Sequence, residues 1–435
     1  MNLPASKNEN LSRNLLWIIW SGVVSIANSV LLWIFIARLR DTEELGRFTT
    51  VMGLYALFFT VCSMGLMPYI VSEISRRNAE KTVENFIGSV SVFLFISGFI
   101  CAILMTASGF LVSESSSVRI STAILSLAMI PTGLISTAEA TAIAYGRTRL
   151  IAFVSTFENL LRTIVPLVLL YAGFDISIIC VSFVAVRFVA LAIYFVAARN
   201  LLAKFAFNKI EFAKILKVTP TFAGTIILAA INWQAAIILL GRISTENESA
   251  KFGVASRFLI PVAILMASYA SVIQPTISKF TNENSGAYLA KMARYPLTLA
   301  TFAAIASPFL SRFVLTLFFG EKYADVAPVL DILAVSVVPF CLVMVVARGL
   351  VATNSQHIDF AANALGVIAF FAVGLVLIPN YGAKGAAIAQ LVSFLLMALF
   401  EIFYLSKKIN NFKIWRTASL SSVFLIVTYI IIWKF

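Results

Sequence analysis

The chain has 435 residues, of which 60% are hydrophobic and only 12% are charged, and its formal net charge is +13 at pH 7. Soluble domains are typically about 45–50% apolar and about 25% charged, so this composition excludes a soluble enzyme and a disordered protein. The basic residues lie between apolar runs and form no single patch, which excludes a nucleic-acid partner and indicates an integral membrane protein.

The apolar runs predict membrane spans, because a spanning helix needs about 20 apolar residues. Twelve runs qualify in chain order, at 14–38, 48–71, 85–110, 118–144, 150–171, 176–198, 218–241, 251–277, 294–319, 325–352, 357–379 and 383–405. A shorter thirteenth candidate lies at 417–433. The first run is too long for a signal peptide, so we expect no cleavable leader.

The spans fall into two sets of six that an offset of 207 residues relates. Gly46 and Pro68 near the second span, and Gly253 and Pro275 near the eighth, are both 22 residues apart. This register predicts an all-α membrane protein with a parallel 6+6 repeat, which is typical of a secondary transporter. We expect a six-helix lobe at 1–199, a basic cytoplasmic linker at 200–217, a second lobe at 218–406, and a basic segment with a candidate extra helix at 407–435.

The positions of the basic residues predict the orientation of the chain. If the N-terminus is cytoplasmic, the inner loops hold 19 Lys and Arg residues and the outer loops hold 9. This excess favours a cytoplasmic N-terminus. We expect the linker to lie on the anionic lipids of the inner leaflet.

The sequence contains no Ser/His/Asp set, Walker A motif or HExxH motif, so we expect a transporter and not an enzyme. The four cysteines and the single histidine have no metal-ligand spacing, so we also expect no metal site.

Three charged residues are predicted to meet near the middle of the membrane. Glu158 is eight residues into the fifth span, Arg162 follows one helical turn later, and Arg187 is eleven residues into the sixth. Intramembrane charges mark a function or a buried pair. The cluster either pairs two helices or forms a cationic cavity wall that binds an anion, for which the planar fork of arginine is suited.

Further polar residues lie in the predicted spans. Arg257, Arg312 and Asp331 form a second group in the outer half of the other repeat, whereas Glu139 and Arg348 lie near inner ends, where charge is less costly. Asn28 and Asn232 occupy the matching first helices of the two lobes. They either bind sugars in a central cavity or form hydrogen bonds between helices.

Six short motifs give the chain a family resemblance over residues 10–406. In order they are ARLRDTEELGRF, PYIVSEISRR, FENLLR, KFGVASRF, GEKYADVAPVLDIL and YGAKGAAIAQ. In this order and spacing the chain resembles the Wzx-type polysaccharide (O-antigen) flippases of the multidrug/oligosaccharidyl-lipid/polysaccharide (MOP) exporter superfamily. Arg40 departs from the pattern, since the family usually has Gly there.

The resemblance implies a V-shaped, MATE-like pair of lobes in the bacterial cytoplasmic (inner) membrane. It implies alternating access that moves an undecaprenyl-pyrophosphate-linked oligosaccharide, such as a lipopolysaccharide repeat unit, to the periplasmic leaflet. Polysaccharide polymerase and chain-length proteins are the expected partners, and no cofactor is expected apart from H⁺ or Na⁺ coupling.

The resemblance also implies roles for the charged residues in the spans. Arg162 and Arg187 are the first candidates to receive the pyrophosphate, and Arg257 and Arg312 are further candidates. Glu158 and Asp331 are the candidates for ion coupling, because a carboxyl at mid-membrane can take up a proton.

Three alternatives remain open at this point. A cation-coupled multidrug antiporter of the same superfamily would favour acidic residues in the spans, whereas here arginine predominates. A membrane polysaccharide polymerase or ligase would resemble chains with a large outer loop, and every outer loop here is short. The third alternative is a lipid II flippase, which usually has fourteen helices. The candidate extra helix at 417–433 keeps this alternative partly open.

Overall fold

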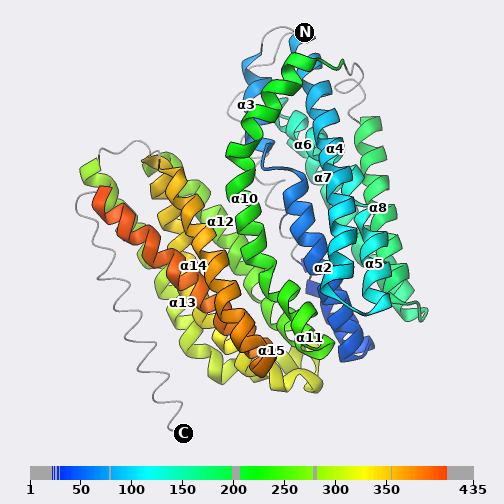
Figure 1. Cartoon of the computed structure of the whole chain (residues 1–435), viewed down its shortest axis with the longest axis vertical. Helices are drawn as coiled ribbons and strands as arrows, with labels where there is room; N and C mark the ends of the chain where they lie inside the picture. Colours follow the sequence, from blue (N-terminus) through cyan, green and yellow to red (C-terminus); the bar gives the residue numbers. More distant parts are fainter. Residues whose placement is uncertain are drawn as a thin grey trace. The chain divides into compact units, whose positions relative to one another are not determined.

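The computed structural model describes residues 22, 24, 27, 28, 30–77, 80–197, 206–277, 282–353 and 355–408. These residues form helices joined by short turns, without a strand (Figure 1). The chain divides into two compact units. The first consists of Met1–Leu39 and Val51–Ala230, and the second of Arg40–Thr50 and Ile231–Phe435. Two long helices, α2 (Thr42–Cys62) and α10 (Lys209–Ile243), each contribute residues to both units.

The first unit contains most of the helices in the first half of the chain. After the apolar helix Val30–Leu39 and α2 come α3 (Met67–Arg76), α4 (Glu80–Val112), α5 (Ser116–Ser126), α6 (Met129–Ala144), α7 (Thr148–Tyr171) and α8 (Ile176–Ala197). A core of buried side chains from α3, α4, α6 and α8 includes Ile70, Phe86, Leu94, Ile135 and Tyr194. Helices are the expected solution here, because each one satisfies its own backbone hydrogen bonds where water is absent.

Small residues let α4 and α6 approach closely. A Cβ atom at Gly133 would overlap the carbonyl oxygen of Leu94, and one at Gly98 would lie 2.6 Å from the carbonyl oxygen of Met129. Close backbone approach at small residues is typical of helix packing in membranes. This close contact fixes the position of α6, which lines part of the cavity described below.

The predicted span 48–71 is not one continuous helix. Backbone φ angles of +49° at Met64 and +64° at Gly65 separate α2 from α3, and Pro68 stands in the first turn of α3. Glycine adopts a positive φ readily, and proline fits the start of a helix because it lacks an N–H group. The span therefore breaks at residues 63–66.

The second unit contains α11 (Glu246–Ser256), α12 (Leu259–Ile277), α13 (Asn282–Phe319), the 3₁₀ helix η1 (Glu321–Val326), α14 (Ala327–Ala352) and α15 (Gln356–Lys408). As one straight helix, the 53 residues of α15 would extend about 80 Å, far beyond a membrane core of about 30 Å. The backbone is non-helical at Gly382, where φ is 51°. A carboxylate oxygen of Glu248 accepts a hydrogen bond from the Ala383 N–H at 2.7 Å, which caps the second half.

The segment ARLRDTEELGRF, which joins the first two predicted spans, ends as the first turns of α2. Its residues from Arg40 onward belong to the second unit. Nε of Arg47 lies 2.6 Å from the carboxylate of Glu246, and a Cβ at Gly46 would overlap the backbone of Glu246. The glycine of this motif therefore permits α2 to begin directly against α11.

The predicted spans correspond closely to the observed helices. Within the described ranges, nine helical stretches are long and apolar enough to cross a membrane, where α2 with α3 and α5 with α6 each count as one stretch. The number is ten if the bent pair α11 and α12 counts as one further span. They cover the second to twelfth predictions, and α15 covers both 357–379 and 383–405. The all-helical class is confirmed for these residues. The 6+6 repeat, the lobe boundaries and the orientation remain predictions, and the candidate span 417–433 lies outside the described residues.

Candidate functional site

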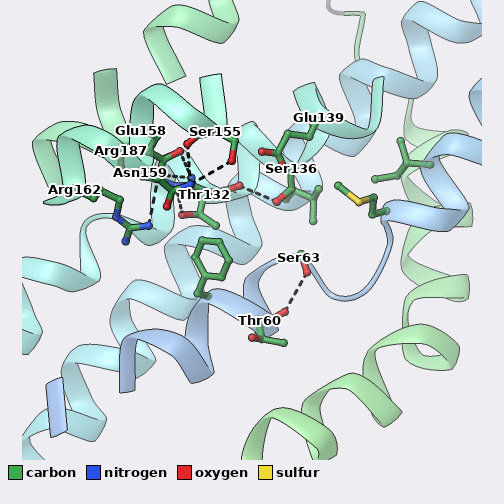
Figure 2. Close-up of a pocket in the computed structure, with 14 residues that line it drawn as sticks. Thr60, Ser63, Thr132, Ser136, Glu139, Ser155, Glu158, Asn159, Arg162 and Arg187 are labelled. Carbon is green, nitrogen blue, oxygen red and sulfur yellow. Dashed lines mark hydrogen bonds and ion pairs between the residues drawn. The ribbon is translucent and has the colours of Figure 1, made fainter. Parts of the chain in front are cut away.

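A cavity of about 420 Å³ opens within the first unit (Figure 2). Its polar lining comes mainly from one face each of α6 and α7. Thr132, Ser136 and Glu139 are spaced four and three residues apart, and Ser155, Glu158, Asn159 and Arg162 repeat a similar helical spacing. The remaining lining residues are Phe59, Thr60, Ser63, Met67, Ile70, Leu94 and Arg187.

The break between α2 and α3 forms another part of the wall. Thr60, Ser63 and Met67 lie at the break and line the cavity. The Thr60 hydroxyl donates to the carbonyl of Ala56 at 2.9 Å, and the Ser63 hydroxyl donates to the carbonyl of Thr60 at 3.1 Å. Non-helical backbone at membrane depth is tolerated where it is buried or lines a cavity, which suits the position of this break.

Glu158 and Arg187 form a buried ion pair. Nη1 of Arg187 donates to both carboxylate oxygens of Glu158, at 2.8 and 2.9 Å, and Nε donates to the Thr132 hydroxyl at 3.1 Å. Glu158 is only 7% exposed and Arg187 only 5%. The guanidinium also lies 5.2 Å from the ring centroid of Phe59. Arg187 is therefore held on several sides by the protein itself.

Arg162 has more open surroundings than Arg187. Its Nη1 is 3.7 Å from Glu158, beyond hydrogen-bonding distance, and its Nη2 donates to the hydroxyl of Tyr55 at 2.9 Å. The guanidinium lies over the rings of Tyr55 and Phe183, at 5.4 and 5.1 Å from their centroids. With 21% of its side chain exposed, Arg162 can offer hydrogen-bond donors to a ligand in the cavity.

Glu139 also lines the cavity, although its predicted place near an inner span end made it a weaker candidate. Its Oε1 accepts a hydrogen bond from the Tyr194 hydroxyl at 3.3 Å. Its spacing from Thr132 and Ser136 was the signal that could have identified it. The predicted cluster of Glu158, Arg162 and Arg187 carried one surplus positive charge. With Glu139 included, the ionised carboxylates balance the two guanidinium groups among the described lining residues.

The other predicted site residues lie elsewhere. Asn28 is outside the described lining, and its carbonyl accepts a hydrogen bond from the Thr163 hydroxyl at 3.4 Å. Asn232 belongs to the second unit, is 2% exposed, and accepts hydrogen bonds from Ser393 and Gln390 at 3.0 and 3.4 Å. It therefore links α10 to the second half of α15.

Arg257, Arg312 and Asp331 also belong to the second unit. Arg312 is exposed on α13, whereas Arg257 and Asp331 are half-buried. Whether any of them binds substrate or couples an ion remains a prediction. In the part of the chain that the structure describes, no three His, Cys, Asp or Glu side chains gather as ligands for a metal ion.

Comparisons with known sequences place the chain among proteins of polysaccharide synthesis. Residues 35–328 match the family described as "Polysaccharide biosynthesis protein". The capsular polysaccharide biosynthesis protein CapF of Staphylococcus aureus is 22% identical over 206 residues, 46% of this chain and 52% of that protein. The "Probable low-salt glycan biosynthesis flippase Agl15" of Haloferax volcanii is 22% identical over 178 residues, 40% of this chain and 38% of that protein. The matches thus span about half of each relative or less.

The fold is similar to those of solved membrane transporters. The lipid II flippase MurJ, in an inward closed conformation, superimposes with a TM-score of 0.78 at 16% identity, covering 96% of this chain and 92% of that chain. An inward-facing MATE multidrug resistance transporter of the MOP superfamily gives a TM-score of 0.68 at 13% identity, covering 89% and 95%. At these identities the likeness shows a common fold.

Proposed function

Because the chain belongs to the polysaccharide biosynthesis protein family, we propose that this multi-pass membrane protein is a flippase for a lipid-linked oligosaccharide. It would move the saccharide headgroup from one leaflet to the other by alternating access. The likeness to the MurJ and MATE folds is consistent with transport, and the names of the relatives point to saccharides as cargo.

The observation that carries the proposal is the accessible guanidinium of Arg162 in the polar cavity of the first unit. A diphosphate linkage between lipid and sugar is a compact anion, which arginine binds through its planar fork of donors. Glu158 already engages Arg187 closely but lies 3.7 Å from Arg162. Arg162 is therefore the proposed first contact of the phosphate groups. Arg187, which Glu158 and Thr132 hold in place, would add a second positive charge to the cavity.

Several finer features belong to the same proposal. The cargo would be an undecaprenyl-pyrophosphate-linked oligosaccharide, such as an O-antigen repeat unit, in a bacterial cytoplasmic membrane. The N-terminus would be cytoplasmic, in line with the excess of basic residues in the inner loops. Polymerase and chain-length proteins would act on the product, and H⁺ or Na⁺ would be the coupling ion.

Replacement of Arg162 provides the direct test. In cells that lack the native gene, Arg162→Gln should impair surface-polysaccharide assembly and cause the lipid-linked oligosaccharide to accumulate. A lost charged hydrogen bond should weaken anion binding on the order of 10- to 100-fold. Arg149→Gln, an exposed arginine of the same helix outside the cavity lining, is the matched control. Normal polysaccharide in Arg162→Gln cells that contain normal protein levels would contradict the proposal.

A further inference from the structure

Glu139 differs from the other ionisable side chains of the cavity, because in the described ranges no cation contacts it. Its carboxylate instead accepts a hydrogen bond at 3.3 Å from the hydroxyl of Tyr194, a residue that is only 1% exposed. Glu158, in contrast, has Arg187 at 2.8 Å and Arg162 at 3.7 Å. Glu158 therefore contacts a guanidinium group directly, whereas the one side-chain hydrogen bond that Glu139 makes among the described residues is to a hydroxyl.

The surroundings of Glu139 contain few other titratable groups. Its helix α6 packs against α3, α4, α7 and α8. Helix α7 contributes Glu158 and Arg162 to the cavity. Helix α8 contributes Arg187 to the cavity and also carries Tyr194, whose hydroxyl donates to Glu139. Helices α3 and α4 contribute only Met67, Ile70 and Leu94 to the described lining, and these side chains do not titrate. Glu139 is thus the group best placed to change the charge of the cavity.

The protonation state of Glu139 decides whether the cavity attracts an anion. When Glu139 is ionised, the two carboxylates balance the two guanidinium groups that line the cavity. When Glu139 is neutral, one positive charge remains. Electrostatic interactions are strong where water is scarce, so an anion should bind better to the form that carries the proton.

We propose that Glu139 is a proton-binding site linked to anion binding, so that a proton and the diphosphate group of the substrate bind to the cavity together. This inference rests on the proposed function, because it assumes that the cavity receives a diphosphate. Linkage is reciprocal, so the bound diphosphate should also increase the affinity of Glu139 for its proton. Glu139 would then make substrate binding sensitive to pH.

The test is a titration of the purified full-length protein with farnesyl diphosphate, a short polyprenyl diphosphate, across a range of pH. Glu139→Gln keeps an acceptor for Tyr194 but removes the charge, and Glu114→Gln, an exposed glutamate outside the cavity lining, is the control. The probe itself titrates equally with every variant, so the ratio of the affinities of parent and Glu139→Gln isolates the contribution of Glu139.

We expect the affinity of the parent, relative to Glu139→Gln, to fall by up to about tenfold per pH unit as Glu139 ionises. Glu114→Gln should follow the parent. Calorimetry in buffers of different ionisation enthalpy should show that the parent takes up more protons on binding than Glu139→Gln. Parallel affinity curves together with equal proton uptake would overturn the linkage. If Arg162→Gln binds the probe as tightly as the parent at every pH, the anion site is absent and the proposed function itself fails.

Discussion

At the scale of single residues, the two arginines of the cavity have different surroundings although both lie near Glu158. Arg187 is buried and makes three hydrogen bonds to Glu158 and Thr132, whereas Arg162 is 21% exposed and makes one, to Tyr55. Protein groups therefore enclose Arg187, whereas part of the Arg162 side chain stays accessible. On this difference rests the proposal that Arg162 contacts the ligand.

Replacing Arg187 should destabilise the protein, because it leaves Glu158 as a buried charge without its closest partner. We expect Arg187→Met to lower the free energy of unfolding by about 3–5 kcal/mol. The double variant Glu158→Gln/Arg187→Met should recover much of this loss, because neither charge then remains buried. Thermal unfolding in detergent measures both effects. A double variant that is no more stable than Arg187→Met would show that the ion pair is not the source of the loss.

Part of this cluster was predictable from the sequence, and part was not. Their distances from the predicted span ends place Glu158 and Arg187 at one depth. In the structure, Nη1 of Arg187 lies 2.8 Å from Oε1 of Glu158. Glu139 was ranked below the other charged residues because only its predicted depth in the membrane was considered. The face of α6 on which it lies was not. Depth follows from the 1.5 Å rise of a helix, whereas the direction of a side chain also depends on how the helices pack.

At the scale of elements, the cavity depends on two features of the helices that bound it. The break between α2 and α3 supplies polar groups at Thr60 and Ser63, and the close contact of α4 with α6 at Gly133 fixes the polar face that begins at Thr132. A straight second span or a wider helix spacing would change the shape of this wall.

Gly133→Ala should separate α4 from α6 and reduce both stability and anion binding. The added methyl group would overlap the backbone carbonyl of Leu94, which cannot move as a flexible side chain can. Inserting extra atoms into a packed interior typically costs about 1–3 kcal/mol. Gly22→Ala, at a helical glycine with open space around its Cβ position, is the control and should leave the melting temperature nearly unchanged. Equal melting temperatures for both variants would contradict the role of Gly133.

The helices were largely predictable from the sequence, but their interruptions were less so. Apolar runs of about 20 residues located the second to twelfth spans because membrane helices must be apolar over that length. The break at Met64 and Gly65 was not predicted, since glycine and proline are frequent in membrane helices without breaking them. The placement of Arg40–Thr50 in the second unit was not predicted either, because it depends on contacts with Glu246, about 200 residues away.

At the scale of the whole molecule, the chain consists of two helical units, of which the first contains the proposed site. Helices α2 and α10 carry the chain from one unit to the other, at Thr50–Val51 and at Ala230–Ile231. Of the residues predicted to bind substrate, Arg162 and Arg187 line the cavity of the first unit, whereas Arg257, Arg312 and Asn232 belong to the second. The charges of the first unit are therefore the ones on which the functional proposal depends.

The most direct test of this proposal is a transbilayer assay in vesicles that contain the purified protein and a polyprenyl-diphosphate-linked oligosaccharide. The headgroup in the inner leaflet is initially hidden from a glycan-cleaving enzyme added outside. We predict that the protein exposes these headgroups to the enzyme, that Arg162→Gln slows their exposure, and that Arg149→Gln does not. If the headgroups stay protected in vesicles that contain folded parent protein, the protein does not flip this class of lipid and the account is contradicted.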